Sequence, residues 1–191
     1  LFGSRIGILG YGALGRALHK LVIPFKPQVI VHDPWLPTVA IEEADCTPVA
    51  FDEIFRTAGV LFVTAAVTTE NVHAISSPQL DSMADDSILV LLSRAAVADF
   101  PALISAARSG RIRIATDVFP EEPVPPTDPL RESGILLSGH RAGGIDWAFK
   151  EMGHYLVTDL GQMVRGLPPV KCAQALPETV SRLRSRPVKK S

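Results

Sequence analysis

Four polar residues that suit acid–base chemistry follow the ends of apolar runs: Arg94, Asp117, Glu122 and His140. If these runs are parallel strands, their carboxyl ends meet at one edge of a sheet, which brings the four side chains together. An arginine binds a carboxylate through two hydrogen bonds, a histidine exchanges a proton near neutral pH, and a neighbouring glutamate orients the imidazole. Each residue alone is typical of a loop or a solvated surface. As a set at one edge, they favour proton transfer to the carbonyl oxygen of a 2-oxo acid during hydride transfer.

A glycine-rich segment, Gly10-Tyr11-Gly12-Ala13-Leu14-Gly15, follows an apolar run and opens a helical pattern. Gly10 permits a tight turn, Gly12 lets a pyrophosphate approach the backbone, and Gly15 allows helix and strand to pack closely. The start of the helix presents free N–H groups to the anion. Asp33 ends the next apolar run, 23 residues beyond Gly10, where a carboxylate binds a ribose diol and repels a 2′-phosphate. The pattern predicts a dinucleotide site that favours NAD over NADP, and the motif alone is also compatible with FAD.

Short, near-continuous apolar runs alternate with helical patterns along the chain. Strands of this composition are buried on both faces, as in a parallel sheet covered by helices. The expected strands are 5–9, 29–32, 60–64, 88–92, 112–116 and 135–137. The expected helices are 14–21, 51–56, 77–83, 99–109 and 146–165, and the proline-rich segment 120–129 is expected to form a rigid loop. The predicted fold class is α/β, a doubly wound parallel sheet of the Rossmann type.

The composition excludes several classes of protein. The 191 residues are 47% hydrophobic and 20% charged, which is typical of a globular chain, and the net charge of −1 argues against nucleic-acid or membrane-surface partners. The most hydrophobic stretch, 59–67, is far shorter than the roughly 18 residues of a membrane helix. Cys46 and Cys172 have no Cys or His at zinc-ligand spacing, which predicts no metal site and a reducing, cytoplasmic location.

The ends of the chain suggest a division into two parts. We expect an NAD-binding domain over 1–165 and a basic tail over 166–191, since seven Lys or Arg and one Glu lie between Arg165 and Ser191. The first residue is Leu1, and a strand pattern begins within a few residues of it. We therefore expect a further segment to precede this one in the natural protein.

Several motifs in order resemble one family, the D-isomer-specific 2-hydroxyacid dehydrogenases, up to about residue 165. The resemblance rests on Gly-Tyr-Gly-Ala-Leu-Gly at 10–15 with Val-His-Asp-Pro at 31–34, Ser-Arg at 93–94, Ser-Gly-Arg-Ile at 109–112, Asp-Val-Phe-Pro-Glu-Glu-Pro at 117–123 and Gly-His-Arg-Ala-Gly-Gly at 139–144. It implies that Arg94 binds the substrate carboxylate, that His140 is the general acid and base, and that Glu122 pairs with His140. It also implies NAD as cofactor and a small 2-hydroxy or 2-oxo acid as substrate.

The resemblance implies further cofactor contacts. Ala13 and Leu14 would donate backbone N–H groups to the pyrophosphate, Asp117 would face the nicotinamide carboxamide, and the cleft would be lined by Ala65, Ala66, Leu92 and Gly143. Members of the family bind substrate between this domain and a second one formed mostly by an N-terminal segment, which is absent here, and they are usually homodimers. The isolated fragment is therefore expected to bind NAD but to be inactive.

The chain departs from the family pattern at several positions. It has Thr64-Ala65-Ala66 in place of His-x-Pro, Leu91 in place of Asn, Ala95 in place of Gly and Gly139 in place of Pro. These changes leave open an alternative function, a non-catalytic NAD-binding module that acts through protein partners, as in the corepressors of this family. Because Arg94, Glu122 and His140 are all present, the principal prediction is an NAD-dependent D-2-hydroxyacid dehydrogenase.

Overall fold

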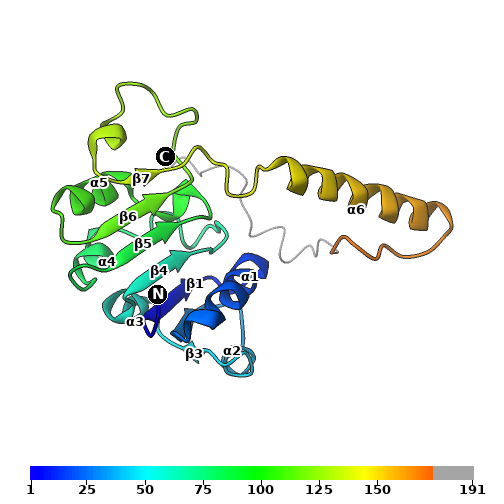
Figure 1. Ribbon diagram of the computed structural model, residues 1–191, viewed down its shortest axis with the longest axis horizontal. Helices are drawn as coiled ribbons and strands as arrows, with labels where there is room; N and C mark the ends of the chain where they lie inside the picture. The colour runs from blue at the N-terminus through cyan, green and yellow to red at the C-terminus, as the bar shows by residue number, and fades with distance from the viewer. Residues whose placement is uncertain (174–191) are drawn as a thin grey trace.

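The computed structural model describes residues 1–173 and consists of a parallel sheet with helices on both faces (Figure 1). The strands are β1 (Arg5–Leu9), β2 (Gln28–His32), β3 (Thr47–Pro48), β4 (Val60–Val63), β5 (Ile88–Leu91), β6 (Arg113–Thr116) and β7 (Leu136–Leu137). The helices are α1 (Ala13–Val22), α2 (Thr38–Glu42), α3 (Phe51–Thr57), α4 (Ser77–Asp81), α5 (Phe100–Arg108) and α6 (Asp146–Val164). Short 3₁₀ helices cover Ile23–Phe25, Ala95–Val97 and Pro129–Glu132.

The seven strands lie in the order β3-β2-β1-β4-β5-β6-β7, and every neighbouring pair is parallel. β1 pairs with β2 on one side and with β4 on the other, so that Gly7 lies opposite both Ile30 and Leu61. The chain therefore leaves β1 in one direction and later returns to its other side. A crevice opens at such a switch point, at the carboxyl ends of the strands.

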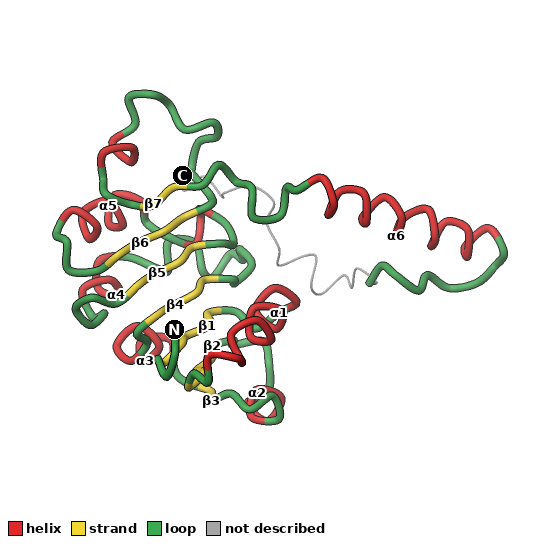
Figure 2. Tube along the Cα trace, viewed as in Figure 1, coloured by secondary structure: helices red, strands yellow, loops and turns green. Residues whose placement is uncertain are grey.

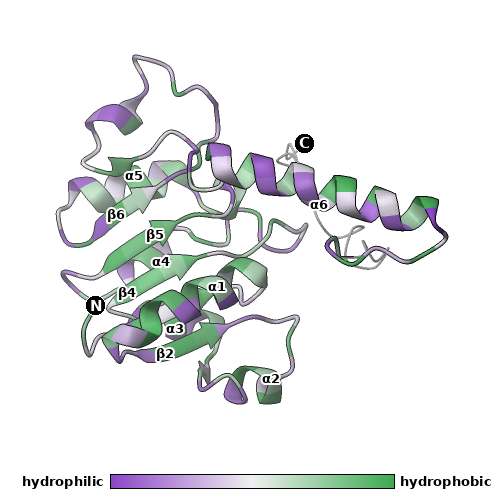
Figure 3. Cartoon of the chain, turned by 45° about the vertical axis from the view of Figure 1, so that its right-hand side comes forward, coloured by the Kyte–Doolittle hydropathy of each residue, from purple (hydrophilic) through white to green (hydrophobic). Residues whose placement is uncertain are grey.

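Alternate residues of the strands pack against different helices, because successive side chains point to opposite faces of a sheet. Ile6 and Ile8 of β1 belong to a buried cluster that includes Val22 of α1 and Ile41 of α2. On the opposite face, a larger cluster includes side chains from β4, β5, α3 and α5, among them Leu61, Leu89, Ile54 and Leu103. Burial on both faces explains the near-continuous apolar runs of β1 and β2 (Figure 3), whereas β5 and β6 are fully buried on one face only. The order of the strands and the helices on both faces confirm the predicted doubly wound fold.

The predicted strands and helices are all present, with bounds that differ by a few residues, and the predicted loop 120–129 is irregular up to Pro129, where a 3₁₀ helix begins. Sequence patterns missed β3 and α2, which lie between β2 and α3. β3 has only two residues, Thr47 and Pro48, and neither belongs to an apolar run; pairing with Ile30 and Val31 alone defines it as a strand. Only 166–173 of the predicted tail can be described, because 174–191 lie outside the described residues.

Helix α6 extends away from the sheet (Figures 1 and 2). The chain after it folds back, because the Asp159 carboxylate accepts hydrogen bonds from the backbone N–H groups of Val170, Lys171 and Cys172. Burial alone would raise the pKa of Asp159. The hydrogen bonds outweigh this effect and lower the pKa from its ordinary value to about 2. No helix within residues 1–173 is long and apolar enough to cross a membrane.

Replacement of a central core residue tests the dependence of the fold on this packing. Leu89 is fully buried in β5, so Leu89→Ala is expected to lower the free energy of unfolding by about 2–5 kcal/mol through lost contacts and a cavity. The control is Leu136→Ala at an exposed position of β7, with an expected change below about 0.5 kcal/mol. Urea denaturation measures both, and equal effects would contradict the described core.

Candidate active site

A cleft of about 830 Å³ opens at the carboxyl ends of β1, β2 and β4. Seven of the residues predicted to bind a cofactor line it: Gly10, Gly12, Ala13, Leu14, Asp33, Ala65 and Ala66. Among the described residues, its lining does not include Gly15, Leu92, Asp117 or Gly143. The cleft thus brings together the glycine-rich loop, the acidic end of β2 and the segment after β4.

The glycine-rich loop needs its glycines for two different steric reasons. Gly10 has φ +91°, and a Cβ there would lie 2.4 Å from the Cα of Ala65. At Gly15, a Cβ would lie 2.4 Å from the carbonyl oxygen of Gly10, so α1 packs directly on the loop. No atom lies within 4 Å of a Cβ built on Gly12, which leaves its backbone open to the cleft. The first N–H groups of α1 have no carbonyl partner within the helix, so this loop suits a pyrophosphate.

The Asp33 carboxylate lies at the carboxyl end of β2 and is held by two backbone groups. Its Oδ2 accepts a hydrogen bond from the N–H of Tyr11 at 2.7 Å, and its Oδ1 accepts one from the N–H of Trp35 at 2.9 Å. A carboxylate has about four lone-pair sites, so each oxygen retains the capacity to accept a hydroxyl. The residues present therefore fit a nucleotide with a pyrophosphate and a free ribose diol.

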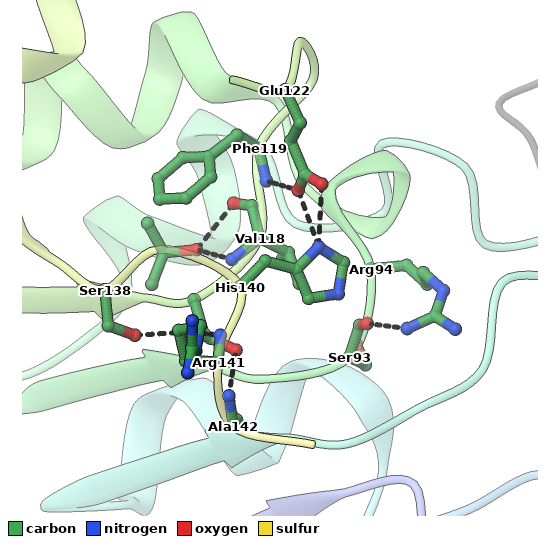
Figure 4. Close-up of polar contacts among 11 residues, drawn as sticks. Ser93, Arg94, Val118, Phe119, Glu122, Ser138, His140, Arg141 and Ala142 are labelled. Atoms are coloured by element: carbon green, nitrogen blue, oxygen red, sulfur yellow. Dashed lines mark hydrogen bonds and ion pairs between the residues drawn. The ribbon is translucent and has the colours of Figure 1, made fainter. Parts of the chain in front are cut away.

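His140 and Glu122 form a hydrogen-bonded pair at the same edge of the sheet (Figure 4). Nδ1 of His140 lies 2.8 Å from each carboxylate oxygen of Glu122, and Oε1 of Glu122 also accepts the N–H of Phe119 at 3.1 Å. The two side chains are 43% and 38% exposed, so a ligand in solution can reach them. With Nδ1 bound to the carboxylate, Nε2 is the imidazole atom available for proton exchange.

Asp117 shapes the loop that carries His140. Its side chain is only 2% exposed and accepts hydrogen bonds from the Ser138 hydroxyl and, at 2.8 Å each, from the N–H groups of Arg141 and Ala142. Burial alone would raise the pKa of Asp117. The hydrogen bonds outweigh this effect, so the pKa of Asp117 lies below its ordinary value. The hydrogen bonds described for the Asp117 side chain therefore all go to residues 138–142, which surround His140, a residue with φ +53°. Holding a non-glycine residue in this region costs energy that the surrounding contacts must supply.

Arg94 lies where the chain leaves β5, at the start of the 3₁₀ helix Ala95–Val97. Its Nη1 donates a hydrogen bond to the carbonyl oxygen of Ser93 at 2.7 Å, which orients an otherwise exposed guanidinium. Figure 4 shows Arg94 and His140 on loops at the same end of the sheet. A guanidinium beside a proton donor can bind a carboxylate while the donor reaches an adjacent oxygen.

Sequence patterns missed several residues of the cleft. Thr64 donates a hydrogen bond from Oγ1 to the carbonyl oxygen of Gly10 at 2.6 Å, and Trp35 and Phe51 also line the cleft. Thr64 lies one position after the end of β4, and Trp35 lies three positions after the end of β2. Their place just after a strand is a signal that the sequence offered. Phe51 carries no such signal, because it comes from the first turn of α3.

The fold and the cleft define a dinucleotide-binding domain of the Rossmann type. The sequence matches the family described as D-isomer specific 2-hydroxyacid dehydrogenase, NAD binding domain, over residues 1–142. The chain therefore belongs to this family, and its cofactor is NAD.

Individual relatives agree with this assignment. The chain is 30% identical over 171 residues to a glyoxylate reductase from Thermococcus litoralis, covering 88% of this chain and 52% of the relative. It is 28% identical to a D-3-phosphoglycerate dehydrogenase from Archaeoglobus fulgidus, covering 93% of this chain and 34% of the relative. A phosphoglycerate oxidoreductase from Rhizobium etli has a similar structure, with a TM-score of 0.82, 41% identity, and coverage of 93% of this chain and 53% of that one. The chain thus spans about half the length of such relatives, or less.

The loop that carries His140 can be tested through Asp117. Asp117→Asn replaces one acceptor oxygen with an amide group, so one buried N–H of the loop loses its partner. The expected loss in the free energy of unfolding is about 1–3 kcal/mol, measured by chemical denaturation. The control is Asp81→Asn at an exposed position of α4, with an expected change below about 0.5 kcal/mol. A similar stability for both variants would contradict this role of Asp117.

Proposed function

We propose that this chain is the cofactor-binding part of an NAD-dependent dehydrogenase that interconverts a small 2-hydroxy acid and its 2-oxo acid. The observation that carries the proposal is the His140–Glu122 pair near Arg94, at the sheet edge that also holds the dinucleotide cleft. NAD, when bound, supplies the hydride acceptor or donor. The protein must then bind the carboxylate of the substrate and exchange a proton with its oxygen.

The cleft residues have separate roles in holding the cofactor. Gly12, Ala13 and Leu14 present backbone N–H groups to the pyrophosphate, and Asp33 accepts the ribose hydroxyls. The side chain of Asp33 also disfavours a 2′-phosphate, because like charges would lie in contact. Ala65 and the adjacent Ala66 form the wall on the side of β4 and leave room for the cofactor.

The proton is handled by His140. Glu122 accepts the Nδ1 proton and holds the ring, so Nε2 can donate a proton to the carbonyl oxygen in reduction and accept it from the hydroxyl in oxidation. Arg94 binds the substrate carboxylate through its planar guanidinium. Geometry of this kind orients the reacting carbon against one face of the nicotinamide, which supports specificity for one isomer, and the family match supports the D isomer.

The assembly and location of the complete protein also belong to this proposal. Relatives about twice as long support a second domain that completes the substrate site. Apolar residues exposed in the last turn of α1 and in the 3₁₀ helix after it, including Leu21, Ile23 and Phe25, support a homodimer interface on this side of the domain. Cys46 and Cys172 are free thiols, which supports a reducing compartment such as the cytoplasm.

The cofactor site is tested by NADH and NADPH titration followed by fluorescence. Asp33→Ala removes hydrogen bonds to a charged acceptor, so NADH affinity is expected to fall about 10- to 100-fold and the preference over NADPH to decrease. Asp81→Ala, outside the cleft, serves as the control. Equal NADH affinity in wild type and Asp33→Ala would refute the assigned ribose contact.

The catalytic role of His140 is tested with the complete enzyme and a panel of 2-oxo acids that includes glyoxylate. His140→Ala is expected to lower kcat by about 100- to 10,000-fold while leaving NADH affinity within about twofold, because a proton donor is lost but the cofactor cleft is not changed. His154→Ala, on the exposed surface of α6, is the matched control. A His140→Ala enzyme that keeps most of its turnover would rule out this assignment.

A further inference from the structure

A buried polar network lies directly behind the glycine-rich loop. Tyr11 belongs to that loop and is among the residues that line the cleft, but it is only 2% exposed and its side chain packs in the apolar cluster with Ile6 and Ile8. Its hydroxyl lies 2.7 Å from Nδ1 of His19, a buried residue of α1. The buried thiol of Cys46, in the turn before β3, lies 3.6 Å from the Tyr11 hydroxyl and 3.5 Å from Nδ1 of His19. The loop, α1 and the edge of the sheet therefore meet at three polar side chains.

The hydrogen bonds of this network have a consistent direction when all three groups are neutral. The thiol of Cys46 donates to the Tyr11 hydroxyl, and the hydroxyl donates to Nδ1 of His19. The surroundings are apolar, since Ile6, Ile8, Val31 and Ile41 belong to the same cluster. Burial raises the pKa of Tyr11 to about 12, raises the pKa of Cys46 and lowers the pKa of His19, so the neutral forms are favoured near neutral pH.

Tyr11 connects this network to two groups of the cleft. Its backbone N–H donates the 2.7 Å hydrogen bond to Asp33, the residue assigned to the ribose. The guanidinium of Arg16, which lines the cleft, lies over the Tyr11 ring with its central carbon 4.9 Å from the ring centre. A shift of the Tyr11 side chain would therefore displace both a carboxylate and a cation that face the cofactor.

We propose that Tyr11, His19 and Cys46 position the dinucleotide cleft, and that NAD affinity falls when His19 binds a proton. This inference rests on the proposed function, because it concerns the affinity of the same cleft. A proton on Nδ1 changes this atom from an acceptor into a donor, so the Tyr11 hydroxyl loses its acceptor. A positive charge on buried His19 is also unfavourable without water around it, so protonation favours entry of water and displacement of the glycine-rich loop. His19 is a positioning residue, because it acts on the cofactor only through Tyr11.

Other charged groups near the network modify this response without removing it. Asp45 attracts a proton to His19 and so opposes the effect of burial. Arg16 acts on Tyr11 and Cys46, where its charge favours the ionised forms. His140 lies on the loop after β7 and does not line the cleft.

The experiment is an NADH titration of the 191-residue chain at several values between about pH 7.5 and about pH 5, with circular dichroism to show that each sample is folded. Wild-type affinity is expected to fall about three- to tenfold across this range, the effect of one neutral hydrogen bond. The His19 ring signal in NMR should titrate with the same midpoint. His19→Asn keeps an acceptor for the Tyr11 hydroxyl but cannot titrate there, so it should bind as wild type at the upper pH and show no such fall.

A second variant makes the test independent of the folding of His19→Asn. Tyr11→Phe keeps the ring under Arg16 but removes the hydroxyl, so its affinity should be about three- to tenfold lower at the upper pH and independent of His19 titration. Constant wild-type affinity, or an unchanged pH dependence in both variants, would overturn the network inference while leaving NAD binding intact. Failure of wild type to bind NADH at any pH would instead refute the proposed function, and this inference with it.

Discussion

The common direction of the seven strands is the constraint on which the described site depends. Because all strands are parallel, each one ends at the same edge, and each return connection must cross a face of the sheet. Residues that follow β1, β2 and β4 therefore form one cleft, and Arg94, Glu122 and His140, which follow β5, β6 and β7, lie at the same edge of the sheet. The reversal of strand order at β1 places the glycine-rich loop against Ala65, where a single Cβ on Gly10 would prevent the approach. Packing and chemistry thus depend on the same topology.

Carboxylates at this edge are held mainly by backbone N–H groups. Asp33 binds the N–H groups of Tyr11 and Trp35, Asp117 binds those of two residues beside His140, and Glu122 binds that of Phe119. Backbone donors fix an acid without requiring a second flexible side chain to be ordered. These carboxylates differ in burial: Asp117 is buried and holds a loop, whereas Glu122 remains accessible beside the His140 imidazole.

The departures from the family pattern are compatible with this arrangement. Thr64, where the resemblance leads one to expect histidine, binds the carbonyl oxygen of Gly10 and so connects β4 to the glycine-rich loop. Leu91, in place of asparagine, is fully buried in β5 and belongs to the main core, where an unpaired amide would be unfavourable. Thr64 thus contributes a backbone contact and Leu91 contributes core packing, and the sequence retains Arg94, Glu122 and His140.

The sequence by itself determined the main strands, the helices that cover them, the glycine-rich turn and the edge at which Asp33, Arg94, Glu122 and His140 gather. These features depend on local periodicity and on the rule that parallel strands end together. Only the tertiary structure decided the short strand β3, the walls of the cleft at Phe51, the partners of Asp117 and the network of Tyr11, His19 and Cys46. Such contacts join residues far apart in the chain, 35 positions in the case of Tyr11 and Cys46. Local sequence patterns do not encode them, because each side chain acquires its partner only when the sheet and helices have packed.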